Sequence, residues 1–205
     1  MNEERQKVSR RTFLAGIAGM AGAIIFGAKI FAAKRFGYLA SFIRPPGAVE
    51  ESLFLKKCIG CAKCMEACRN DCIRMLGAEA GMSRFKTPAI IPRAKGCTLC
   101  MECTKVCPTG ALKRIALGAP LTPENINMGK AELNKSICYS YNGRTCGVCY
   151  RACPLQGKAM TIGLFERPEV HPEACVGCGL CEQACMHLPQ AIKVLDRKRV
   201  SYETL

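Results

Sequence analysis

The chain has 205 residues and a mass of 22.3 kDa, carries a formal net charge of +14, and contains 17 cysteines but no tryptophan. Its length corresponds to one or two small domains. A hydrophobic content of 49% with 22% charged residues excludes a disordered chain. No run of 18 uninterrupted apolar residues occurs, which excludes a polytopic membrane protein. Because aromatic residues make up only 6%, cysteine chemistry is expected to organise part of the core.

Residues 1–35 are predicted to form an export signal. Arg10 and Arg11 stand before Phe13 and Leu14, and an apolar stretch covers residues 13–28. This arrangement resembles a twin-arginine signal, whose route carries folded proteins and so suits a chain loaded with a metal cofactor in the cytoplasm. The alternative is an N-terminal helix that stays in place as an anchor. No clear Ala-x-Ala cleavage site follows the apolar stretch, so retention as an anchor stays open.

Four cysteine runs organise the sequence after residue 50. Runs one, two and four have C-x2-C-x2-C-x3-C spacing, and run three differs only in its first gap of seven residues. The runs are Cys58, Cys61, Cys64 and Cys68 (run one); Cys97, Cys100, Cys103 and Cys107 (run two); Cys138, Cys146, Cys149 and Cys153 (run three); and Cys175, Cys178, Cys181 and Cys185 (run four). These 16 cysteines are the candidate metal ligands.

The spacing within the runs predicts iron–sulfur clusters. Three cysteines at i, i+3 and i+6 on a tight loop can bind three irons of one cubane, and the fourth is expected to begin a helix that carries its sulfur to a different cluster. A tetrahedral zinc site uses two C-x2-C pairs and leaves the third cysteine without a role. Disulfides, which export permits, do not explain four repeats with such regular gaps. We therefore expect four [4Fe-4S] clusters.

The excess of basic residues is expected to offset the charge of the clusters. Residues 36–205 hold 23 lysines and arginines against 14 acidic residues, a net charge of +9. A [4Fe-4S]²⁺ core with four thiolates carries about −2, so four of them carry about −8. The basic residues are scattered instead of forming an aromatic-interleaved patch. No nucleic-acid partner is therefore expected.

Two tandem bacterial-ferredoxin-like units, each with two clusters, are predicted to follow the signal. Run three is separated from run four by 22 residues and run one from run two by 29, counted from the last cysteine of one to the first of the next. Residues 117–135 contain several Gly, Pro and Asn and form the expected connector. The units therefore cover residues 36–118 and 119–205. The fold class is α+β with short helices and with short strands at residues 112–117, 160–165 and 192–195.

The gaps favour sequential pairing of the runs, in which each cluster takes three cysteines from one run and the fourth from the neighbouring run. A nested arrangement, with run one paired to run four and run two to run three, stays open. Under sequential pairing the four ligand sets are Cys58, Cys61, Cys64 and Cys107; Cys97, Cys100, Cys103 and Cys68; Cys138, Cys146, Cys149 and Cys185; and Cys175, Cys178, Cys181 and Cys153.

Cys72 falls outside the four runs. When the repeats are aligned, it occupies the position of Ala111, Ala159 and Ala191, each of which precedes an apolar residue. Cys72 is therefore expected to be a small core residue, with a ligand role as the lesser alternative.

Motifs for other redox groups or for catalysis are absent from the sequence. No C-x-x-C is followed by histidine, and neither a G-x-G-x-x-G fingerprint nor a P-loop occurs. No paired-carboxylate or nucleophile–base set is recognisable either. The sequence therefore predicts a protein that transfers electrons without catalysing a reaction of its own.

With these motifs, the sequence resembles the NapG/MauM family of exported ferredoxin-type proteins over essentially its full length. Besides the twin arginines and the long gap of run three, the resemblance rests on Arg-Pro-Pro-Gly-Ala at residues 44–48, Cys-Tyr-Arg-Ala-Cys-Pro at 149–154 and Ala-Ile-Lys-Val-Leu at 191–195. Arg69 and Met186 depart from the two-cluster ferredoxin pattern, in which proline follows the fourth cysteine. These departures affect the chain after the ligand and leave the ligand in place.

The resemblance implies four [4Fe-4S] clusters and a non-catalytic component of a quinol dehydrogenase in anaerobic respiration. Electrons would pass from a membrane iron–sulfur quinol-oxidising partner, NapH-like, to a periplasmic reductase or cytochrome, of which nitrate reductase is the best-known example. The methylamine-utilisation branch serves a different system. The implied location is the periplasm or the outer face of the cytoplasmic membrane. The alternative function is that of an iron–sulfur electron-transfer subunit within a larger molybdenum oxidoreductase.

Overall fold

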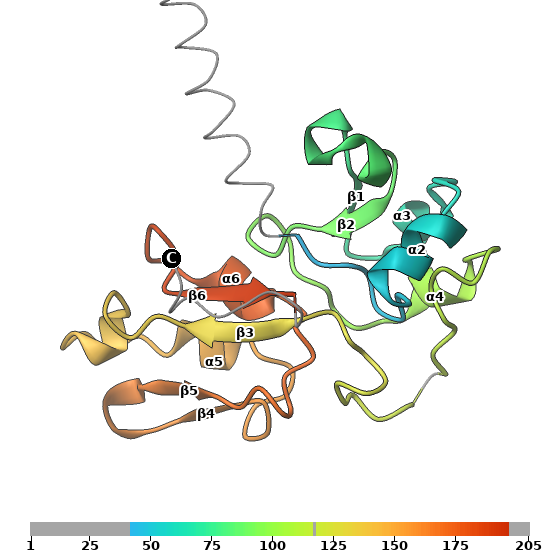
Figure 1. Cartoon of the computed structure of the whole chain (residues 1–205). Helices are drawn as coiled ribbons and strands as arrows, with labels where there is room; N and C mark the ends of the chain where they lie inside the picture. The colour runs from blue at the N-terminus through green and yellow to red at the C-terminus, as the bar shows by residue number, and fades with distance from the viewer. Residues whose placement is uncertain (1–41, 117, 197–205) are drawn as a thin grey trace, which may run out of the picture. The chain divides into compact units, whose positions relative to one another are not determined.

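A computed structural model describes residues 42–116 and 118–196, so the predicted signal lies outside the described residues. These residues belong to one compact unit, Ser41–Leu205. It consists of short helices and two-stranded sheets, as the α+β prediction requires (Figure 1). Within the described ranges, no helix has the length and apolar character needed to cross a membrane.

The helices are one or two turns long. The longest, α2 (Glu51–Lys57), is capped by the Glu50 carboxylate, which accepts a hydrogen bond from the backbone N–H of Ser52 at 3.0 Å. Four short α-helices belong to the cysteine runs, and single 3₁₀ turns lie between the other elements. These are α3 (Lys63–Glu66), α4 (Glu102–Lys105), α5 (Val148–Arg151) and α6 (Leu180–Ala184), with η1 (Ala78–Ala80), η2 (Met82–Arg84), η3 (Tyr139–Tyr141) and η4 (Leu164–Glu166).

Three antiparallel two-stranded sheets connect these loops and helices. The first half of the described chain is residues 42–116, and the second half is residues 118–196. In the first half, β1 (Ile73–Met75) pairs with β2 (Pro88–Ile90). In the second half, β4 (Met160–Ile162) pairs with β5 (Pro168–Val170), and β3 (Lys130–Leu133) pairs with β6 (Ile192–Leu195). The predicted connector at residues 117–135 therefore contributes a strand to the second half.

The predicted strand at residues 112–117 is wrong for the part that the structure describes. Leu112 forms only an isolated bridge with Ala48, and no strand follows it through residue 116. The backbone N–H of Ile115 donates instead to the side-chain hydroxyl of Thr104 at 3.2 Å, so it does not hydrogen-bond with a neighbouring strand. The predictions for residues 160–165 and 192–195 are confirmed by β4 and β6, although β4 is shorter than predicted.

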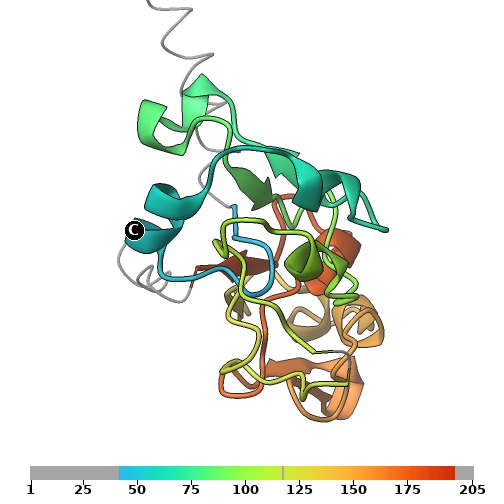
Figure 2. The same ribbon diagram turned by 90° about the vertical axis from the view of Figure 1, so that its right-hand side faces the viewer.

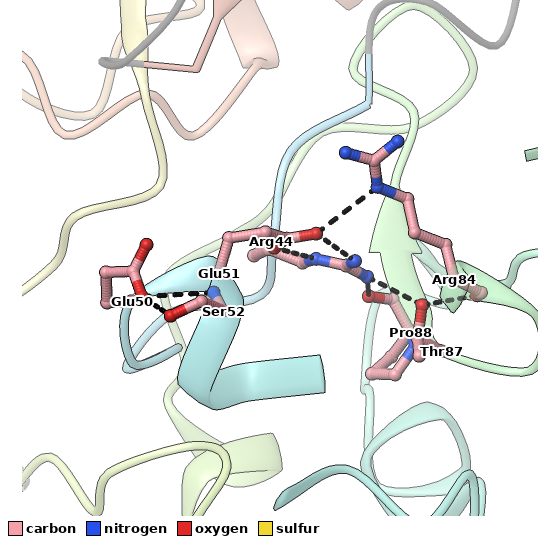
Figure 3. Close-up of polar contacts among 7 residues, drawn as sticks. All are labelled: Arg44, Glu50, Glu51, Ser52, Arg84, Thr87 and Pro88. Carbon is pink, nitrogen blue, oxygen red and sulfur yellow. Dashed lines mark hydrogen bonds and ion pairs between the residues drawn. The ribbon is translucent and has the colours of Figure 1, made fainter. Parts of the chain in front are cut away.

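Arg44, in the Arg-Pro-Pro-Gly-Ala segment, ties α2 to the first sheet (Figure 3). Its guanidinium, 8% exposed, donates to both carboxylate oxygens of Glu51 at 2.8 and 2.7 Å. It also donates to the Thr87 hydroxyl at 2.9 Å and the Pro88 carbonyl at 2.8 Å, and it lies over the Phe54 ring at 4.6 Å. All these contacts use the planar fork that distinguishes arginine from lysine.

We expect Arg44→Lys to destabilise the loaded protein by about 2–4 kcal/mol, because it breaks a bidentate, largely buried ion pair. The temperature at which the cluster absorbance bleaches should fall by on the order of 5–10 °C. As the control, Lys95→Gln removes an exposed 4.0 Å pair with Asp71 and should change stability by less than about 1 kcal/mol. Equal effects from the two substitutions would contradict the structural role of Arg44.

Candidate metal centres

Each cysteine run folds into a loop that turns through left-handed backbone. The residue after the second cysteine has positive φ in all four runs, and the residue before it does so in three. The former are Ala62, Met101, Gly147 and Gly179, and the latter are Gly60, Leu99 and Gly177. For residues other than glycine, this conformation costs about 1–2 kcal/mol each, so the loops around Leu99 and Met101 hold strain. The turns direct successive cysteines of one loop toward a common centre.

Helices α3, α4, α5 and α6 begin immediately after these left-handed residues. Each helix contains the third cysteine of its run, and the fourth cysteine follows the end of the helix. The expectation that the fourth cysteine begins a helix is therefore wrong. The reason is local: the left-handed residue after the second cysteine is the point at which the chain turns into the helix.

Three cavities of nearly equal size are each lined by four cysteines. They enclose about 350, 350 and 360 Å³ of space between atoms, including space open to solvent. Site one is lined by Cys58, Cys61, Cys64 and Cys107, site three by Cys138, Cys146, Cys149 and Cys185, and site four by Cys175, Cys178, Cys181 and Cys153. In every case three cysteines come from one run and the fourth from its sequential neighbour, as sequential pairing predicts and nested pairing does not.

Site two is formed by the remaining run and contains a fifth thiol. Cys103 interacts electrostatically with Cys100, Cys68 and Cys72. Cys72 interacts electrostatically with Cys97, and its sulfur lies 3.4 Å from the sulfur of Cys68. Site two therefore consists of Cys97, Cys100, Cys103 and Cys68, with Cys72 beside them. Cys72 is buried, as its alanine position predicts, but it also contacts candidate ligands.

Site two and site four meet at the contact between the two halves. The backbone N–H of Cys97 donates to the carbonyl of Cys178 at 2.7 Å. The neighbouring Gly96 N–H donates to the Gln183 side chain at 2.8 Å, and the Arg93 guanidinium donates to the Cys185 carbonyl at 2.7 Å. In both views α6 lies between the first half and α5 (Figures 1 and 2). A candidate ligand residue of site two is thus hydrogen-bonded through its backbone to a candidate ligand residue of site four.

Several buried thiols are biased toward the neutral form. Burial raises the pKa of Cys64 to about 11 and the pKa values of Cys103, Cys149 and Cys178 to about 12. Iron binds the thiolate, so loading the sites must release protons. Backbone N–H groups already point at several sulfurs at 3.4 Å, from Leu99 to Cys97, from Leu112 to Cys107 and from Ala131 to Cys175.

The donor set fits iron–sulfur clusters. Each site offers four sulfurs, the ligands that hold [4Fe-4S] cubanes, and at sites one, three and four they surround cavities of similar size. Within residues 42–116 and 118–196, no three Cys, His, Asp or Glu side chains are grouped closely enough to hold a single metal ion. When bound, the clusters supply one-electron transfer; the chain supplies their ligands, their hydrogen bonds and their burial.

Residues outside the cysteine runs also line the cavities. Phe54 and Met75 line site one, and Tyr139 and His187 line site three, where their rings meet at 4.9 Å. Phe54 lies four residues before Cys58, and His187 two after Cys185. Proximity to a ligand was the available sequence signal, but it does not distinguish a lining side chain from a solvated one.

The fold and the cysteine sites define a ferredoxin-type iron–sulfur protein with repeated dicluster segments. Comparison with known families agrees: the 4Fe-4S dicluster domain matches residues 57–111 and 142–188. The methylamine utilization ferredoxin-type protein MauM of Methylorubrum extorquens is 35% identical over 176 residues, covering 78% of this chain and 74% of the relative. The ferredoxin-type protein NapG of Escherichia coli (strain K12) is 34% identical over 201 residues, covering 91% and 85%.

The ferredoxin-type protein NapF of Escherichia coli (strain K12) is more distant, at 24% identity over 146 residues that cover 70% of this chain and 79% of NapF. The chain belongs to the family of NapG and MauM ferredoxin-type proteins. It is an iron–sulfur protein of electron transfer, and its repeat architecture agrees with the prediction from the cysteine runs.

Proposed function

We propose that the chain carries four [4Fe-4S] clusters, one at each site, and that electrons pass along them in the spatial order one, two, four, three. The contact between Cys97 and Cys178 carries this proposal, because it joins site two to site four and leaves sites one and three at the ends. Cys64 of site one interacts electrostatically with Cys103 of site two, and Cys149 of site three does so with Cys181 of site four. These interactions support placing site one next to site two and site three next to site four, so that the four sites form a row.

The end sites are the proposed points of electron entry and exit. Cys61 of site one is exposed, and Ile59, which lies between Cys58 and Cys61, is 68% exposed. At site three, Met186 and Leu188 follow Cys185 and are 64% and 72% exposed. Exposed apolar side chains beside a redox group suit docking of a partner protein. We assign entry to site one, because it offers the exposed ligand.

The proposed donor is a membrane iron–sulfur protein that oxidises quinol, NapH-like, and the proposed acceptor is a periplasmic reductase or cytochrome such as nitrate reductase. Membership in the NapG and MauM family supports a relay role in a respiratory or methylamine-related system. The similarity to NapG and NapF supports a role in the Nap electron-transfer pathway. The chain itself offers no recognisable catalytic motif, so partners must supply both ends of the path.

The partner proposal is tested with vesicles containing the NapH-like protein and a reduced quinone. We expect the clusters of added protein to be reduced, as followed by EPR, and to be reoxidised when periplasmic nitrate reductase and nitrate are added. Vesicles without the NapH-like protein are the control. Equal reduction in both vesicle preparations would contradict the proposed donor. Stable co-purification with a molybdenum subunit, without reduction by these vesicles, would favour the subunit alternative.

Export by the twin-arginine route is a further part of the proposal. Replacing Arg10 and Arg11 together by Lys should leave loaded protein in the cytoplasm and slow respiration with the periplasmic acceptor. Cell fractionation with EPR of each fraction measures both the location and the clusters. Clusters should persist, because no candidate ligand lies in residues 1–35. Periplasmic accumulation equal to that of the parent would contradict this route.

A further inference from the structure

Site two differs from the other three sites by one buried thiol. Cys72 is 3% exposed and occupies the position of Ala111, Ala159 and Ala191, which are equally buried. Its sulfur lies 3.4 Å from that of Cys68, within hydrogen-bonding distance for sulfur. It also interacts electrostatically with Cys97, a second candidate ligand of the same site. Five thiols therefore meet where a cubane takes four.

The repeat decides which of the two neighbouring thiols binds iron. Cys68 has the C-x3-C spacing shared with Cys107, Cys153 and Cys185. Each of these three lines a cavity with the first three cysteines of the partner run. The position of Cys72 holds alanine at the other sites, which still gather four sulfurs. Cys68 therefore corresponds to the ligand and Cys72 to an additional neighbour.

We propose that the Cys72 thiol donates an S–H hydrogen bond to the Cys68 sulfur, raising the reduction potential of the cluster at site two. This inference rests on the proposed binding of a cluster at that site. Reduction adds negative charge to the cluster and its sulfurs, and a hydrogen bond to a ligand sulfur stabilises that charge. The sites with alanine in this position lack the donor. Site two would thus draw electrons inward from site one.

The test is an EPR-monitored redox titration of the full-length loaded protein. In Cys72→Ala, which installs the residue that the other repeats hold, we expect iron content to stay at the parent value and one cluster to titrate at a lower potential. The reduced-to-oxidised ratio of that cluster at fixed potential should fall about tenfold, which is 59 mV for one electron. Cys72→Ser keeps a hydroxyl donor and should recover part of the shift.

A control variant and the iron content keep the outcomes separate. In a Cys100→Ala background, which removes the cluster at site two, Cys72→Ala should move none of the remaining potentials. Four unchanged potentials in the Cys72→Ala variant would overturn the hydrogen bond, and loss of one cluster's iron would make Cys72 a ligand instead. Failure of the underlying cluster proposal has a different signature, since the parent protein would then already lack the expected iron.

Discussion

Anaerobically purified protein is expected to contain about 16 iron atoms and as many inorganic sulfides per chain, the content of four cubanes. Single substitutions should then remove one cluster each, and Cys107→Ala is the most informative of them. Cys107 belongs to run two but lines the cavity of site one. We therefore expect Cys107→Ala to have the same EPR spectrum as Cys58→Ala, because both lose the cluster of site one.

The matched control is Cys100→Ala, which lies in the same run as Cys107 but belongs to site two. Its spectrum should differ from that of Cys107→Ala and coincide with that of Cys68→Ala. If the spectra grouped by run, with Cys107→Ala and Cys100→Ala alike, the crossed ligand sets would be wrong. About eight irons per chain, or stoichiometric zinc, would contradict the cluster assignment as a whole.

Loss of the cluster at site four is expected nearly to abolish electron transfer from the quinol-oxidising donor to the acceptor, because site four connects site two to site three. Cys175→Ala is the suitable substitution, since Cys175 lines the cavity of site four and is only half-buried. Sites one and two should still be reduced rapidly by the donor, while site three should stay oxidised on the same timescale. Stopped-flow mixing followed by freeze-quench EPR measures this difference.

Removal of site three provides the contrasting variant. In Cys146→Ala we expect sites one, two and four all to be reduced by the donor, because the missing cluster lies at the end of the row. Magnetic coupling between reduced clusters gives a second readout: Cys175→Ala should leave site three uncoupled, whereas Cys146→Ala should leave three mutually coupled clusters. The order one, two, three, four predicts the opposite pair of spectra and would be adopted if they were observed.

The α+β class, the family and the candidate ligands could all be predicted from the sequence, because each depends on local spacing. A cubane requires three sulfurs within one short loop, so Cys58, Cys61 and Cys64 reveal their chemistry without knowledge of distant contacts. The position of the helix within each run could not be predicted from the spacing of the cysteines. It depends on left-handed backbone at residues such as Ala62 and Met101, whose side chains do not favour that conformation.

Contacts between distant segments were decided only by the tertiary structure. Strand β3 lies in a region whose Gly, Pro and Asn indicate a connector, and it becomes a strand because β6, some 60 residues later, supplies its hydrogen-bond partners. Residues 113–116 have strand-like character but lack such a partner, since their neighbours are the Thr104 hydroxyl and the Gly47 carbonyl. The proposed order of the sites likewise depends on contacts between distant segments, such as the hydrogen bond from Cys97 to the Cys178 carbonyl.

Cys72 shows, at a single residue, the difference between what the sequence predicts and what the tertiary structure decides. The sequence by itself determined that Cys72 is small, buried and outside the repeating ligand pattern, because those properties follow from its alignment with alanines. Only the tertiary structure places its sulfur against Cys68 and brings it into electrostatic interaction with Cys97 of the next run. Local spacing specifies which atoms can bind iron, whereas the packing of distant segments decides which of them share a cluster and what tunes it.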